Sequence, residues 1–406
     1  MRGLRDIVCV FEFHQPSRLR PFRFLEVGQD ADYFDETLDR ELLERVADRC
    51  YGPVNALFGR LGRRFGERFE VGLSFTGTLL DQLEDWAPAT LEAWRTLLAD
   101  GRHELLCETS HHSLTYAADP DEFRLQVAAQ RERLASLFGA RPTTFRNTEL
   151  IADEALVAEV EALGFEGLLI EGAERRLEGR SPAGAYTVGR SSRLRALPRS
   201  YALADDLAFR FSDPGWIHHP LSPETWVEWL LSVPGDAPVI GLFMDVETFG
   251  EHQAADTGVF AFFERAVELL LERSQVRLCG PGRALREAEP SGAIRFSDTV
   301  SWADADRSLG AWLGNPMQRA AFEALYRLGP RVRALAPAFP ELVEHWRRLT
   351  TSDHLYYMST ASGPDGDVHQ HFSPFPSPHD AHIAFMNVLA DLKQRLETAE
   401  SGGSPR

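Results

Sequence analysis

The chain has 406 residues, a formal net charge of −18 and a hydrophobic share of 44%. This composition suits a globular protein with a sizeable core, organised as one large domain with a smaller one or as two domains. The acidic charge argues against nucleic acids and anionic membranes as partners, because both bind positively charged surfaces. No apolar run reaches about 18 residues, so we expect no membrane partner either.

The four cysteines form no CxxC pair and no spacing typical of a zinc site. Cys9 and Cys107 lie in apolar runs, where free thiols commonly pack as small hydrophobic groups. The chain enters a strand-like segment at once, without the pattern of a signal peptide. The sequence therefore predicts a cytoplasmic protein with reduced cysteines.

Short apolar runs alternate with amphipathic ones over the first 280 residues. Strands are predicted at residues 6–13, 69–76, 103–108, 144–151, 165–170, 239–244 and 276–278. Helices are predicted at residues 39–50, 57–65, 78–100, 121–138, 152–163, 226–232 and 260–273. Such alternation indicates an α/β protein with parallel strands and crossover helices, and about seven units favour a barrel, complete or incomplete, over an open sheet.

After about residue 290 the pattern becomes helical. Helices are predicted at residues 315–328, 331–336, 339–350 and 379–400. We therefore expect a barrel over residues 1–290 and a C-terminal helical domain over residues 291–400 that contributes to the active-site cleft. Residues 401–406 are polar and rich in Gly and Pro, which predicts a disordered tail.

The most informative segment follows the apolar run at 239–244. It delivers Asp245, Glu247, Glu251 and His252 within eight residues. Ligands bind beyond the carboxyl ends of parallel strands, so acids at such an end favour an active site over solvent-exposed decoration. Three carboxylates so close together repel one another, and we expect at least one of their pKa values to be raised, as a general acid requires.

A second strand end carries Glu149, preceded by Arg146 and two further polar residues. An acid in the first turn of a helix is the ordinary alternative, but it does not explain why a polar cluster ends a strand. Arg146, if close in space, would lower the pKa of Glu149 and keep it ionised. Two carboxylates from two strand ends are what the cleavage of a glycosidic bond needs.

Histidines and acids also gather at the ends of the first and third predicted strands. Acids four residues apart in a strand share one face, although buried or surface structural roles are the ordinary alternative. A zinc site would need an HExxH or similar pattern, which is absent here. The expected substrate contacts from these segments are His14, Gln15, Glu104, Glu108 and His112.

Tryptophans and carboxylates recur together elsewhere in the chain. Flat rings stack on sugar faces while acids accept hydroxyl protons, although core packing explains any single tryptophan equally well. Glu247 and His252 are further expected substrate contacts. The expected substrate contacts from these segments, in which tryptophan or tyrosine lies close to an acid in the sequence, are Trp216, Trp302, Asp306, Trp312, Asp353 and His354.

The chain resembles glycoside hydrolase family 57, the family of α-amylases and 4-α-glucanotransferases, and most of all its short α-amylase-like branch. The resemblance rests on five sequence blocks that occur in the same order as in the family. The blocks are residues 14–16, 104–114, 145–150 and 243–252, followed by the C-terminal Trp/Asp and Ser352-Asp353-His354 segments. The resemblance implies an incomplete (β/α)7 barrel followed by a helical domain. It also implies Glu149 as nucleophile, Asp245 as acid/base, and His14, Glu104 and Asp353 as substrate contacts.

The chain is thus expected to be a retaining glycoside hydrolase that acts on the α-1,4 bonds of α-glucans. Its partner would be an oligo- or polysaccharide, and the two-carboxylate mechanism needs no metal or organic cofactor. Residues 107–112 depart from the glucanotransferase pattern of the family, which leaves the preferred substrate open. The sequence does not predict an oligomeric state.

Three alternative functions remain open at this point. The first is a 4-α-glucanotransferase with the same machinery, and the second is a non-catalytic glucan-binding protein. The third is a metal-dependent polysaccharide deacetylase or α-mannosidase on a related barrel. Its candidate ligands would be His14, His111, His112 and Asp245.

Overall fold

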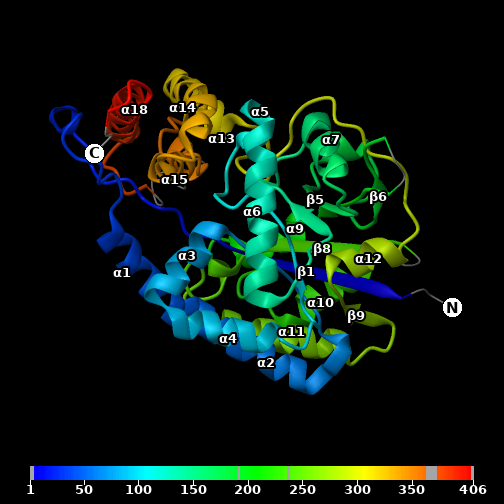
Figure 1. Cartoon of the computed structure of the whole chain (residues 1–406). Helices are drawn as coiled ribbons and strands as arrows, with labels where there is room; N and C mark the ends of the chain where they lie inside the picture. The colour runs from blue at the N-terminus through cyan, green and yellow to red at the C-terminus, as the bar shows by residue number, and fades with distance from the viewer. Residues whose placement is uncertain (1–3, 191–192, 236–237, 363–372, 404–406) are drawn as a thin grey trace.

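The computed structural model describes residues 4–190, 193–235, 238–362 and 373–403. At its centre is a parallel sheet whose strands lie in the order β3-β2-β1-β8-β7-β5-β4. Figure 1 labels β1, β8 and β5 of this sheet. A parallel bridge between Cys107, just after β3, and Phe145 of β4 joins the two edges. The sheet is therefore nearly closed into a barrel of seven strands. These are β1 (Arg5–Phe13), β2 (Gly72–Phe75), β3 (Glu104–Leu105), β4 (Thr144–Arg146), β5 (Gly167–Glu171), β7 (Arg195–Arg199) and β8 (Val239–Asp245).

Two short strands lie off this path. β6 (Tyr186–Thr187) pairs antiparallel with β7, and β9 (Val276–Leu278) pairs with the first residues of β1. β2 pairs with β1 only further along, from Val10 onward. The amino-terminal half of β1 therefore has β9 as a neighbour where a closed barrel would have β2.

Helices connect the strands as the alternation predicts, and several begin at a side-chain cap. Thr76, Asp119, Asp153 and Ser222 each accept a hydrogen bond from the backbone of the first helical turn. The helices of this part are α1 (Glu36–Val46), α2 (Gly52–Phe65), α3 (Gly77–Trp86), α4 (Pro88–Leu98), α5 (Thr115–Ala118), α6 (Pro120–Phe138), α7 (Glu154–Ala162), α8 (Glu174–Leu177), α9 (Tyr201–Ala208), α10 (Pro223–Ser232), α11 (Val259–Leu271) and α12 (Pro281–Glu287).

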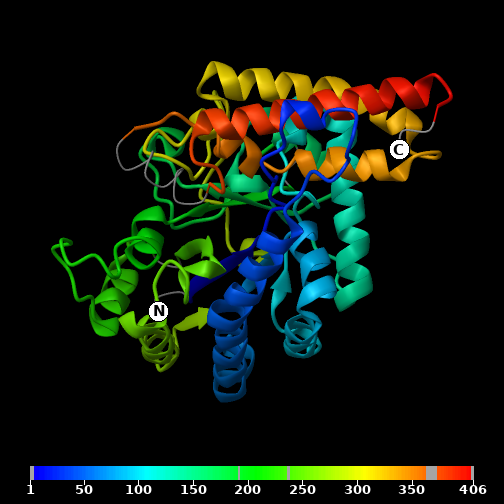
Figure 2. The ribbon, with the colours of Figure 1, turned by 90° about the vertical axis from the view of Figure 1, so that its left-hand side faces the viewer.

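The C-terminal helices gather at one end of the molecule, where Figure 2 shows them in yellow, orange and red. The segment between β1 and α1 reaches them, since the Tyr33 hydroxyl donates to Asp391 and the Asn387 amide to the carbonyl of Phe22. These helices are α13 (Gly310–Leu313), α14 (Pro316–Leu335), α15 (Pro340–Leu349), α16 (Asp353–Tyr356) and α18 (Pro378–Glu400).

One hydrophobic cluster joins these helices to the barrel, because it contains Trp312 and Trp346 as well as Phe145 and Leu168 of the strands. The division into domains at residue 290 remains a prediction. Residues 401–403 continue α18 with backbone hydrogen bonds, and the rest of the predicted tail lies outside the described residues. Among the described residues, the structure contains no helix that is both long and apolar enough to cross a membrane.

Some predicted elements differ from the observed ones for identifiable reasons. The helix predicted at residues 78–100 is two helices, because Pro88 interrupts the helix after Ala87 and begins a new one. The strand predicted at 144–151 ends at Arg146 and becomes a 3₁₀ turn over Thr148–Leu150. β7, α9 and α12 were not predicted. The two helices predicted at residues 315–328 and 331–336 are the single helix α14, with Pro330 inside it.

Gly250 offers a test of how tightly the turn after β8 is packed. Its φ is 108°, and an added Cβ would lie 2.1 Å from the carbonyl oxygen of Arg49. At Gly258 φ is 83°, but an added Cβ would meet nothing within 4 Å. We expect Gly258→Ala to lower the free energy of unfolding by about 1–2 kcal/mol through backbone strain alone, and Gly250→Ala to lower it by clearly more. Urea unfolding measures both, and equal losses would contradict the packing described.

Candidate active site

The carboxyl ends of the strands bring several acids to one edge of the barrel. In the strand register Glu12 of β1 lies opposite Asp245, the last residue of β8, and opposite Ser74 of β2. The turn after β4 carries Glu149. Glu12 was missed by the sequence analysis, although it is the one charged residue in the otherwise apolar run of residues 7–13 and was a usable signal.

Glu149 occupies a strained backbone position, with φ 56° and ψ 25°. Its Oε1 lies 3.2 Å from Nε2 of His112, and its Oε2 accepts a 2.6 Å hydrogen bond from the Trp302 indole. Burial opposes ionisation, but the hydrogen bonds from these two groups and the charge of His112 hold the pKa of Glu149 below its ordinary value. Glu149 is therefore an ionised carboxylate with a donor on each oxygen.

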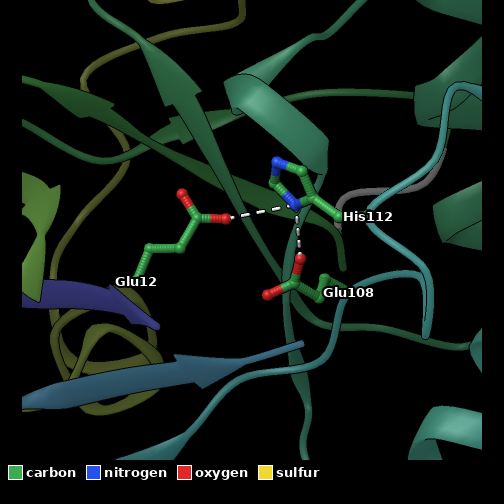
Figure 3. Close-up of side chains that lie close together, drawn as sticks. All are labelled: Glu12, Glu108 and His112. Carbon is green, nitrogen blue, oxygen red and sulfur yellow. Dashed lines mark hydrogen bonds and ion pairs between the residues drawn. The ribbon is translucent and has the colours of Figure 1, made fainter. Parts of the chain in front are cut away.

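Below Glu149 lies a group of buried charges, drawn in Figure 3. Nδ1 of His112 lies 3.0 Å from Oε2 of Glu108 and 3.3 Å from Oε1 of Glu12. Glu12 in turn forms a two-pronged ion pair with Arg146. Although burial opposes it, the charge of Glu12 and the hydrogen bonds to Glu108 and Glu149 raise the pKa of His112 well above its ordinary value. These contacts favour the protonated form of His112.

Arg146 does not have the role that the sequence suggested. It pairs with Glu12 rather than with Glu149, and the groups that lower the pKa of Glu149 are His112 and Trp302. The guanidinium of Arg146 also lies 4.8 Å from the centre of the Trp302 ring. Arg146 thus helps to position both the buried carboxylate of Glu12 and the Trp302 ring.

The C-terminal helices add one acid to this edge. Asp353, the first residue of α16, has its Oδ2 2.9 Å from Nε2 of His14, and Nδ1 of His14 lies 3.1 Å from the Thr76 hydroxyl. The His14 ring stacks on that of His112 with centroids 4.1 Å apart. Burial and the charge of His112 lower the pKa of His14, which favours a neutral ring. Desolvation opposes the ionisation of Asp353, but the facing His14 holds its pKa below the ordinary value.

The acids after β8 separate into different environments. The hydroxyl of Tyr51 donates a 2.6 Å hydrogen bond to Oε1 of Glu247, which is buried. Burial and the charge of Asp245 raise the pKa of Glu247 to about 8. Gln15 also contacts Glu247, whereas Glu251 forms an ion pair of 3.1 Å with Arg45. The expectation of a raised pKa in this group is thus confirmed at Glu247.

Three predicted substrate contacts lie elsewhere and are corrected here. Glu104 begins β3, so it lies at the amino ends of the strands, where it accepts hydrogen bonds from Thr144 and Gly282. Trp312 is fully buried in the helical core. His354 is 2% exposed and its ring packs on Phe385. Helical packing encloses the last two, which therefore cannot contact a ligand in this conformation.

Glu108 and His112 belong to the site but are not open to a ligand. Their side chains are 0% and 2% exposed, against 22% for Glu149, 20% for Asp353 and 14% for His14. A sugar could thus reach Glu149, Asp353 and His14 from solvent. Glu108 and His112 are not accessible to it directly. The expectation that Glu108 and His112 contact substrate is corrected to a supporting position.

The remaining candidates have other surroundings. Trp216 packs against His218 and Trp229, in the segment between α9 and α10. Asp306 is exposed and accepts a hydrogen bond from Ser308 in its own turn. His252 is half-buried in the turn after β8, with its amide bound to the carbonyl of Glu247.

The ligand set of the metal-dependent alternative is only partly in place. His111 turns away from the buried charges, with Nδ1 2.8 Å from the Ser110 hydroxyl and Nε2 3.8 Å from Glu344 of α15. Within the described ranges, one group of three side chains has the spacing of a metal site, namely Glu12, Glu108 and His112. In that group Arg146 already binds both oxygens of Glu12.

The chain matches one family of known sequences. The family described as glycosyl hydrolase family 57 matches residues 8–297. A protein of Methanocaldococcus jannaschii described as "Putative alpha-amylase" is 35% identical over 401 residues, which cover 95% of this chain and 84% of that protein. The resemblance found in the five sequence blocks is confirmed.

Solved structures share the fold at low sequence identity. The 4-alpha-glucanotransferase from Thermococcus litoralis has a TM-score of 0.71 at 15% identity, and the match covers 97% of this chain but 60% of that one. The branching enzyme from Pyrococcus horikoshii has a TM-score of 0.71 at 14% identity, covering 100% and 92%. The alpha-amylase AmyC from Thermotoga maritima has a TM-score of 0.63 at 14% identity, covering 98% and 94%. The predicted fold class, an incomplete (β/α)7 barrel followed by helices, is confirmed.

The raised pKa of Glu247 predicts a specific pH dependence of stability. The folded protein keeps a proton up to about pH 8 that an unfolded carboxyl loses near its ordinary value of 4.5. The free energy of unfolding therefore falls as the pH rises through this window, by up to about 1.4 kcal/mol per pH unit from this group. Glu247→Gln removes the ionisation, so its stability relative to wild type should increase between pH 5 and pH 8 in urea unfolding. Parallel pH profiles for the two proteins would contradict this assignment.

Proposed function

Because the chain belongs to glycosyl hydrolase family 57 and is a glycoside hydrolase, we propose that it cleaves α-1,4 bonds of α-glucans with retention of configuration. The observation that carries the proposal is the setting of Glu149, which is partly exposed and has His112 at one carboxylate oxygen and the Trp302 indole at the other. Asp245 ends a strand at the same edge of the barrel. The name of the Methanocaldococcus jannaschii relative supports an α-glucan as the substrate.

In the proposed mechanism Glu149 attacks the anomeric carbon while Asp245 protonates the leaving oxygen. This forms a covalent glycosyl ester on Glu149 and releases the leaving sugar. Asp245 then takes a proton from water, which attacks the ester and restores Glu149. Retention requires the two carboxyl groups to lie roughly 5–5.5 Å apart in the complex with substrate.

The strained backbone of Glu149 supports this role. A non-glycine residue in the left-handed region costs of order 1–3 kcal/mol and persists where its surroundings fix it. Here the Glu149 carbonyl accepts a hydrogen bond of 3.2 Å from the Trp302 amide, and its side chain has two further partners. A carboxylate fixed in this way loses little orientational freedom when it attacks, which lowers the barrier of a step that depends on alignment.

Around Glu149, three partly exposed groups are proposed as sugar contacts. Asp353 and His14 can exchange hydrogen bonds with hydroxyl groups, and the half-buried Trp302 ring can stack on a sugar face. Gln15 and Glu247 are proposed to complete the polar wall next to Asp245. The C-terminal segment that carries Trp302 and Asp353 is thus proposed to form part of the cleft.

Hydrolysis and transfer share this machinery up to the glycosyl ester. Water as acceptor gives hydrolysis, whereas the hydroxyl of a second glucan gives transfer. We propose that hydrolysis dominates, following the name of the relative in Methanocaldococcus jannaschii. We also propose a cytoplasmic location, which the four free and buried cysteines support.

The two carboxylates are tested by removing each in turn. Glu149→Ala and Asp245→Ala should each lower kcat by about 10³-fold or more on maltoheptaose, because each removes a group that acts in the transition state. Urea unfolding of both variants serves as the control for folding. Azide should restore turnover to Glu149→Ala with inverted anomeric configuration, which NMR of the product detects. Near-wild-type turnover in either variant would refute its assignment.

The sizes of the products formed from maltoheptaose decide between the acceptors. Shorter products alone are expected, since water is the proposed acceptor. Longer and shorter products together would identify a transferase. An identical reaction in the presence of a chelator is the control against a metal-dependent activity.

A further inference from the structure

His112 lies directly beneath Glu149 and is almost sealed from solvent. Building on the proposed role of Glu149, we propose that His112 is a positioning residue: a buried imidazolium that holds the nucleophile through a charged hydrogen bond and touches neither substrate nor a metal ion. Its side chain is 2% exposed, and a sugar in the site would meet Glu149 and His14 first.

The two ring nitrogens of His112 face carboxylates in opposite directions. Nε2 lies 3.2 Å from Glu149, and Nδ1 lies 3.0 Å from Glu108 and 3.3 Å from Glu12. Ionised carboxylates only accept hydrogen bonds, and a neutral imidazole carries a single N–H. A neutral ring would therefore point a lone pair at one of these acids. With these acids ionised, only the protonated ring satisfies both sides.

The charges around His112 favour the same state. The groups that face it come from β1 and the residue just after it, the loop after β3, β4, the turn after β4 and α16. They are the acids Glu12, Glu108, Glu149 and Asp353, the cation Arg146 and the stacked ring of His14. Arg146 can neutralise only one of the four acids. The imidazolium supplies a second positive charge at the centre of the group, where the acids would otherwise repel one another.

The backbone of His112 is fixed as firmly as its ring. Its φ is +49°, which a non-glycine residue adopts at a cost, and its carbonyl accepts a 2.9 Å hydrogen bond from the amide of Ser352. The neighbouring Ser113 forms a β-bridge with Thr351. The segment that places Asp353 in the site therefore also holds His112, so the nucleophile and this acid are positioned together.

A metal ion at Glu12, Glu108 and His112 is the competing use of the same side chains. Their ligand atoms lie within 4.8 Å of one another. Arg146 occupies both oxygens of Glu12, however, and a metal ligand would need the neutral form of His112. The guanidinium and the imidazolium already provide the positive charge that an ion would supply.

The kinetic test compares His112→Gln with His379→Gln, which replaces an exposed histidine on α18. Glutamine can still donate hydrogen bonds through its amide but carries no charge. We expect His112→Gln to lower kcat on maltoheptaose about 10–100-fold, as for the loss of a charged hydrogen bond, with a small change in KM. The acidic limb of the pH profile should move to higher pH, because Glu149 loses the cation that keeps it ionised. His379→Gln should leave both unchanged.

A second measurement needs neither turnover nor a stable variant at position 112. In ¹⁵N-labelled wild-type protein, NMR should show both ring nitrogens of His112 protonated at pH 7, in a chelator-treated sample. Glu149→Gln, which removes one facing charge, should make the ring lose its proton at a lower pH. An unprotonated ring nitrogen of His112 at pH 7 would overturn the proposal. So would an unchanged acidic limb of the pH–activity profile in a folded His112→Gln protein.

The two proposals fail in different ways. If wild-type protein does not cleave maltoheptaose, or if Glu149→Ala retains activity, the proposed function or its nucleophile fails, and the NMR measurement still decides the state of His112. If wild type is active and Glu149→Ala is not, but the His112 ring is neutral, only the present inference fails.

Discussion

A buried ion network, Glu12–Arg146 with Glu108 and His112, is the constraint on which the site depends. Four charged groups without solvent are tolerable only when each has a partner, since breaking such a pair leaves an uncompensated buried charge. The network draws on β1, β4 and the loop between β3 and α5, so it fixes how the barrel edges meet. Glu149 contacts this network through His112, so the position of its carboxylate depends on the network.

Residues of the C-terminal segment also contact this network and the groups beside it. Trp302 donates to Glu149 and lies over Arg146, while Asp353 binds His14 and Ser352 holds the backbone of His112. The site edge of the barrel is therefore enclosed by residues that come far later in the chain. Because these contacts fix the same atoms from two sides, a left-handed backbone at Glu149 and at His112 can persist.

Much of the fold follows from short-range physics. Apolar runs of four to eight residues between amphipathic segments mark buried strands, and most of the helices begin or end at capping residues or prolines that the sequence shows directly. The errors fall where a strand gives way to site geometry: the run at 144–151 was long enough for a strand, but its second half is the strained turn that presents Glu149. β7 was missed because Pro198 and flanking arginines disguise a buried strand.

The sequence by itself determined the α/β class, the acids at the ends of two strands and the family resemblance, because these depend on residue type and on spacing of a few positions. Only the tertiary structure decided which acid pairs with which cation. Arg146 is three residues from Glu149 yet pairs with Glu12, 134 residues away, and His112 rather than Arg146 faces Glu149. It also separated the half-exposed Trp302 from the buried Trp312, since exposure depends on the packing of distant helices and not on local pattern.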